Sequence, residues 1–71
     1  MYNLNKLKGR IIEKFGTQGN FAKAIGVSER TLSLKLDNRV DWKQSEIGKA
    51  CELLEIPKEE IADYFFTLKV Q

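Results

Sequence analysis

The stretch FAKAIGVSERTLSLKL, residues 21–36, most constrains how this chain can fold. Its apolar side chains follow helical spacing, stop at Gly26 and resume after Ser28. Glycine enters the left-handed backbone region without steric cost, so Gly26 predicts a tight turn. A hydroxyl at Ser28 can cap the helix that follows it. The stretch therefore predicts a helix-turn-helix unit over about residues 18–37.

Three further positions fit the geometry of such a unit. Ala22 stands where the two helices must approach closely, so a small side chain is required there. Val27 and Leu32 are apolar and can fill the space between the helices. Together with the glycine turn they are more specific than any one position alone.

The second helix of this unit has an outward face of mixed chemistry. A helix turns about 100° per residue, so with Leu32 at 0° Leu36 falls near 40°, on the core side. On the same wheel Arg30 falls near 160°, Asp37 near 140° and Leu34 near 200°. A leucine therefore points away from the core, beside an arginine. A recognition helix presents such a face to the DNA major groove.

The side chains on and around this face suit contacts with DNA. Arg30 can bond O6 and N7 of guanine, and Leu34 can contact a thymine methyl group. Gln18, at the start of the first helix of the motif, can hold a phosphate. Lys35, Arg39 and Lys43 can contact phosphates. The complete set of predicted DNA-binding residues is Gln18, Ser28, Glu29, Arg30, Ser33, Leu34, Lys35, Arg39 and Lys43.

The rest of the chain predicts three more helices around one core. The first carries one apolar stripe, formed by Leu4, Leu7, Ile11, Ile12 and Phe15. Asn38 can end the second helix of the motif in the left-handed conformation, as glycine does.

Thr17 is the expected N-cap of the helix that opens the motif, and Asp41 that of the fourth helix. Trp42 is expected to close the core beneath a loop, and Cys51 to be a buried structural cysteine. The five expected helices cover residues 4–15, 18–25, 29–37, 42–54 and 57–64, with a short extended tail over 67–71. The predicted fold is an all-α domain of five short helices.

Composition excludes several classes of protein. The chain has 71 residues, no histidine and one cysteine, so one domain without disulfides or metal sites is expected. Nothing assembles a nucleophile, a base and an oxyanion site, so we expect no enzyme, cofactor or small-molecule substrate. No apolar run is long enough to span a membrane and no signal peptide is evident, which indicates the cytoplasm.

The charges are distributed unevenly along the chain. Residues 1–43 hold nine basic and four acidic side chains, whereas residues 44–71 hold three basic and six acidic ones. A basic front half is typical of a protein that faces a polyanion, although ordinary scatter of solvated charge explains it equally well.

The segment GNFAKAIGVSERTLSLKLDNRVDWKQSEIGKACELLEIPKEEI, residues 19–61, resembles the Cro/CI-like (Xre-type) helix-turn-helix regulators of temperate phages. The parts KLDNRVDWKQSEI and EEIADYFF look more like a subgroup of small phage regulators from Gram-positive hosts. The resemblance implies a lambda-repressor-like domain that binds operator DNA, commonly as a dimer. It assigns phosphate binding to Gln18, base reading to Glu29, Arg30 and Leu34, and supporting contacts to Ser28 and Ser33.

These observations lead to two hypotheses. The first is a Cro-like, sequence-specific regulator of a phage lysis–lysogeny switch, with its third helix in the major groove of double-stranded operator DNA. The alternative is an antirepressor, a modulator of repression, that binds the DNA-binding domain of a phage repressor through Arg30, Leu34 and Asp37. An apolar face of mixed charge suits such a partner. For a homodimer, the fourth and fifth helices and the tail are the candidate surfaces.

Overall fold

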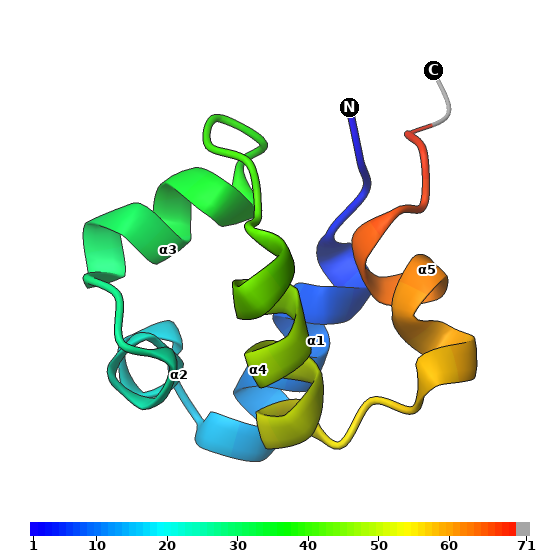
Figure 1. Ribbon diagram of the computed structural model, residues 1–71. Helices are drawn as coiled ribbons and strands as arrows, with labels where there is room; N and C mark the ends of the chain where they lie inside the picture. Colours follow the sequence, from blue (N-terminus) through cyan, green and yellow to red (C-terminus); the bar gives the residue numbers. More distant parts are fainter. Residues whose placement is uncertain (70–71) are drawn as a thin grey trace.

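The protein folds into helices joined by short turns, as a computed structural model that describes residues 1–69 shows (Figure 1). Of the predicted tail, Val70 and Gln71 lie outside the described residues. No helix among the described residues is long and apolar enough to cross a membrane. The elements are α1 (Asn5–Phe15), α2 (Gln18–Ile25), α3 (Glu29–Leu36), α4 (Gln44–Leu54), a 3-10 turn η1 (Lys58–Glu60) and α5 (Ile61–Phe65).

The five helices surround one apolar core, as the sequence predicted. The α2–α3 pair lies on one side of the molecule and α5 on the other, with α1 and α4 between them (Figure 1). The interior includes Cys51, 8% exposed, and burial raises the pKa of its thiol. The largest fully buried side chains are Leu7, Ile11, Phe21, Leu32 and Leu54.

Local signals in the sequence set the helix ends around the motif. The Thr17 hydroxyl accepts a hydrogen bond from the backbone N–H of Asn20 at 3.1 Å, which confirms it as the N-cap of α2. Gly16 and Gly26 end their helices with φ of 81° and 85°, a region open to glycine. Asn38 leaves α3 with φ of 63°, as predicted for an asparagine there.

Two sequence predictions about the core and the helix ends are wrong. Ile12 is 48% exposed, because α1 packs against the core through other residues, such as the neighbouring Ile11. The fourth helix begins at Gln44 and not at Trp42, and Asp41 does not cap it. Instead the backbone N–H of Lys43 donates to Oε1 of Glu46 at 2.8 Å, so a carboxylate from within the helix satisfies its first amide.

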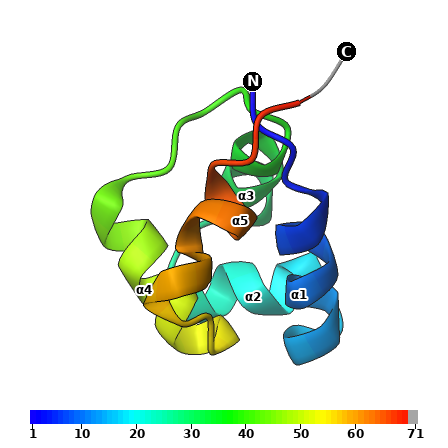
Figure 2. The same ribbon diagram turned by 90° about the vertical axis from the view of Figure 1, so that its right-hand side faces the viewer.

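The two ends of the described chain pair with each other. Tyr2 and Leu68 form an isolated antiparallel bridge, with hydrogen bonds from Asn3 N to Thr67 O at 2.6 Å and from Lys69 N to Met1 O at 3.1 Å. Both views show the N-terminal segment beside the tail (Figure 1, Figure 2). As far as residue 69, the tail thus pairs with the start of the same chain.

A buried ion pair joins α3 to α4. Lys35 is 2% exposed, and its Nζ lies 2.7 Å from Oε1 of Glu46 and 2.9 Å from the carbonyl oxygen of Asp41. Partial burial raises the pKa of Glu46, but the hydrogen bond from Lys35, the backbone N–H of Lys43 and both positive charges outweigh it. The net pKa of Glu46 therefore lies below its ordinary value.

We predict that Lys35→Met lowers the free energy of unfolding by about 2–4 kcal/mol, because it leaves Glu46 and the Asp41 carbonyl without their partner in a largely buried place. Urea unfolding at neutral pH measures this. The exposed Lys23→Met is the matched control and should change stability by less than about 0.5 kcal/mol. Equal losses in the two variants would contradict the structural role of Lys35.

The same pair predicts a dependence on pH. The Glu46 carboxylate has a lower pKa folded than unfolded, so its contribution to stability is complete above the unfolded pKa. The contribution is lost as the pH falls from there through the folded pKa. In Glu46→Gln, stability at neutral pH should be lower and its decline on acidification shallower than in the wild type. Urea unfolding over a pH series measures both, and parallel pH curves would refute the assignment.

Candidate functional site

The outward face of α3 is the candidate site, and the α2–α3 turn sets its direction. Ser28 caps α3, since its hydroxyl accepts from the backbone N–H of Thr31 at 3.0 Å. Val27 packs against the core beneath the turn, and Ala22 and Leu32 are fully buried, as predicted. This packing fixes the core side of α3 and leaves the opposite side to solvent (Figure 1).

The structure brings the predicted face residues together on α3. Arg30, Ser33 and Asp37 are exposed, and Leu34 is half-buried without belonging to the apolar core. Within residues 1–69, Arg30 makes no ion pair. The face thus presents one leucine, one free guanidinium group and one carboxylate. Such a surface offers few donors to base edges and an apolar centre to a protein.

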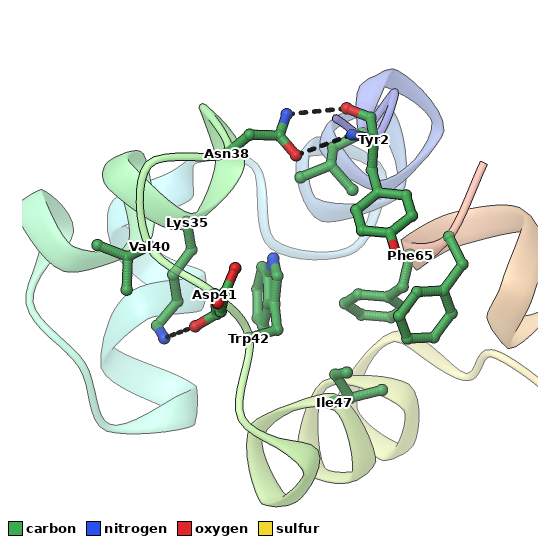
Figure 3. Close-up of a pocket in the computed structure, with 10 residues that line it drawn as sticks. Tyr2, Lys35, Asn38, Val40, Asp41, Trp42, Ile47 and Phe65 are labelled. Carbon is green, nitrogen blue, oxygen red and sulfur yellow. Dashed lines mark hydrogen bonds between the residues drawn. The ribbon is translucent and has the colours of Figure 1, made fainter. Parts of the chain in front are cut away.

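Lys35 does not belong to this face, and its prediction as a phosphate-binding residue is wrong. Its ammonium group donates to the Asp41 carbonyl beside Trp42 (Figure 3). It also pairs with Glu46, and it lies 5.8 Å from the centre of the Trp42 ring. A charge held in this way is unavailable to DNA. The third helix therefore presents fewer positive charges than its sequence suggested.

The remaining predicted residues border α3. Arg39 and Lys43 are exposed in the connection from α3 to α4, where both can meet a bound partner. Gln18 is half-buried at the start of α2. The Ser28 hydroxyl donates to Oγ1 of Thr31 at 2.9 Å besides capping α3, so its hydrogen-bonding capacity is largely used within the motif.

Glu29 lies apart from the other face residues and reaches back to α2. Its side chain covers Gly19, because a Cβ added to that glycine would collide with Oε1 and lie 3.0 Å from Cδ of Glu29. Glu29 is exposed and begins α3, whereas Gly19 lies in the first turn of α2. A carboxylate therefore stands at the junction of the two motif helices.

An aromatic pocket lies near the C-terminal end of α3, and no local pattern in the sequence predicts it. The pocket has a volume of about 370 Å³ and lies between the α3–α4 connection and the paired chain ends (Figure 3). Trp42 packs edge-on against Phe65 with ring centres 5.2 Å apart, which confirms it as a core-closing residue. Its buried Nε1 has no acceptor within the described chain. The aromatic rings lining the pocket belong to Tyr2, Trp42, Phe65 and Phe66.

One side chain clamps the chain start to the end of α3. Asn38 accepts from the backbone N–H of Tyr2 at 3.0 Å and donates to its carbonyl at 2.8 Å (Figure 3). These two bonds join residues 36 positions apart, so no local pattern in the sequence could reveal them. They hold the pocket rim against the connection that follows α3.

These features define a small helix-turn-helix protein whose third helix is exposed but only weakly basic. Residues 1–68 match the family described as protein of unknown function (DUF739), and the chain belongs to that family. No curated protein matches the chain.

A solved structure extends this comparison. The chain is similar to the modulator of repression (MOR) of the temperate bacteriophage TP901-1 from Lactococcus lactis, known from a solution structure. The two are 53% identical, with a TM-score of 0.81, over 99% of this chain and 95% of the other. The expected five-helix fold is confirmed, whereas membership of the Cro/CI-like regulators stays a resemblance.

We predict that the α3 face contributes little to stability. Leu34→Ser should lower the free energy of unfolding by less than about 1 kcal/mol, because this side chain lies outside the core. Leu32→Ala, two positions away and fully buried, should cost about 2–5 kcal/mol. Urea unfolding of both variants measures the difference, and comparable losses would place Leu34 in the core.

Proposed function

We propose that this chain is an antirepressor that binds the DNA-binding domain of a phage repressor. The observation that carries the proposal is the 53% identity, over nearly the whole of both chains, to a phage modulator of repression. It favours the second hypothesis from the sequence over the first, the Cro-like regulator.

The chemistry of α3 supports this choice. Leu34 stands near the centre of the exposed face, and an apolar side chain at such a place can anchor a protein interface. The acidic Glu29 and Asp37 lie at the two ends of α3, where they would repel DNA phosphates. The same carboxylates attract the basic surface of a DNA-binding domain. Lys35 adds no compensating charge, because it is buried.

The mechanism is mutual exclusion. A repressor binds DNA through basic and polar groups on one face of its DNA-binding domain. When α3 of this chain lies against that face, Leu34 excludes water at the centre and Arg30 and Asp37 pair with polar groups around it. The operator and the antirepressor then compete for one surface, so binding of the one releases the other.

A Cro-like DNA-binding regulator is the second candidate. It is favoured by the helix-turn-helix geometry itself and by the exposed side chains of Arg30, in the first turn of α3, and of Arg39 and Lys43, in the connection that follows α3. In that case α3 enters the major groove, and these three cations contact bases and phosphates. The homodimer that resemblance implies would belong to this candidate.

A competition experiment tests the proposal. The repressor of bacteriophage TP901-1, and that of the phage encoding this chain, are each bound to a labelled operator duplex and titrated with the chain. We predict release of the duplex by the wild type. Leu34→Asp should require about thirty-fold more protein, the effect of losing an interface anchor worth about 2 kcal/mol.

The matched control is Ile12→Asp, which places the same charge on an exposed apolar position of α1. It should release the duplex as the wild type does. If the wild type leaves both repressor–operator complexes intact and alone binds either operator with sequence preference, the DNA-binding candidate replaces the antirepressor.

A further inference from the structure

The Glu29 side chain lies over Gly19, and the proposed function assigns no role to this contact. Gly19 is helical, and the described glycines with positive φ are Gly16 and Gly26. Its backbone therefore does not require glycine, and alanine would favour a helix more. The missing Cβ leaves room for the end of the Glu29 side chain, which would have to move aside if position 19 carried a Cβ.

Glu29 is not needed to cap its own helix. The Ser28 side chain performs that task by accepting from the Thr31 N–H. Glu29 also makes no ion pair within residues 1–69. Its carboxylate instead lies against Gly19 in the first turn of α2, in a hollow that Thr17 and Lys23 also line.

The first turn of a helix carries amides without intrahelical acceptors and the positive end of the helix dipole. In helix-turn-helix complexes the first helix of the motif crosses the DNA backbone, so phosphates approach this region. A carboxylate of the protein placed there cancels the local positive potential and repels a phosphate. An arginine or lysine of a partner protein is attracted by the same group.

We infer that Glu29, seated over Gly19, is the specificity-determining residue that turns this motif away from DNA and toward a basic protein surface. The inference rests on the proposed function and names the chemistry of its partner, namely the cationic side chains of a DNA-binding domain. Glycine at position 19 allows this placement, because a Cβ there would move the Glu29 carboxylate away from α2.

The test compares Glu29→Gln and Gly19→Ala with the wild type. Glu29→Gln removes the charge, while Gly19→Ala keeps the net charge and displaces the carboxylate with a Cβ. The control Glu59→Gln removes one exposed carboxylate from η1, on the far side of the molecule from α2 and α3 (Figure 1). Urea unfolding first establishes that each variant is folded.

Binding to a mixed-sequence DNA duplex is then measured between about 50 and 200 mM salt. Both test variants should bind DNA more tightly than the control. The slope of log K against log salt should become steeper by about 0.9, which is the effect of one added phosphate contact. Glu59→Gln should keep the wild-type slope. Slopes of both test variants equal to the wild-type slope would overturn the inference.

The two proposals fail separately. The antirepressor proposal fails if the wild type leaves the repressor–operator complexes intact, whatever the salt slopes. The inference fails if the slopes are unchanged, even where the wild type displaces the operator. A repressor titration gives a second readout, because Glu29→Gln should weaken operator release whereas Glu59→Gln should not.

Discussion

The ion pair between Lys35 and Glu46 holds together the parts of the structure that position α3. The ammonium group of Lys35, on α3, pairs with Glu46 at the start of α4. It also donates to the Asp41 carbonyl in the connection between the two helices. The connection in turn supports Trp42 over Phe65, and Asn38 clamps the chain start beside it. A cation buried in a 71-residue protein is stable only when its charge is fully paired. The α3–α4 connection, the start of α4 and the outward face of α3 therefore depend on one another.

Sequence reasoning succeeded where the cause was local and failed where it was tertiary. Gly26, Ser28 and Asn38 act through their own backbone or the next turn, and each was predicted correctly. Lys35 lies only about 60° from Leu32 on the helical wheel, near the core side, yet its residue type predicted exposure. Its partner, Glu46, comes from another helix, so no local pattern revealed the burial.

The same limit applies to the candidate site. The outward direction of Arg30 and Leu34 was predicted from helical periodicity; in the structure Arg30 is exposed, and Leu34 is half-buried outside the core. The contact between Glu29 and Gly19 crosses from α3 to α2 and depends on how closely the two helices pack. A fold that in other proteins carries a DNA-reading helix presents here a leucine, an arginine and a carboxylate on its third helix, with the Glu29 carboxylate at the junction with α2. The chemistry of that face, and not the fold, separates the two candidate functions.

Amide chemical-shift mapping of the isotope-labelled chain tests most directly whether α3 binds a repressor domain and not DNA. The DNA-binding domain of the TP901-1 repressor and, separately, its operator duplex are the titrants. We expect saturable shifts along α3 and the first turn of α2 with the repressor domain, and only weak, salt-sensitive shifts with the duplex. Saturable shifts of α3 with the duplex, and none with the repressor domain, would contradict this expectation.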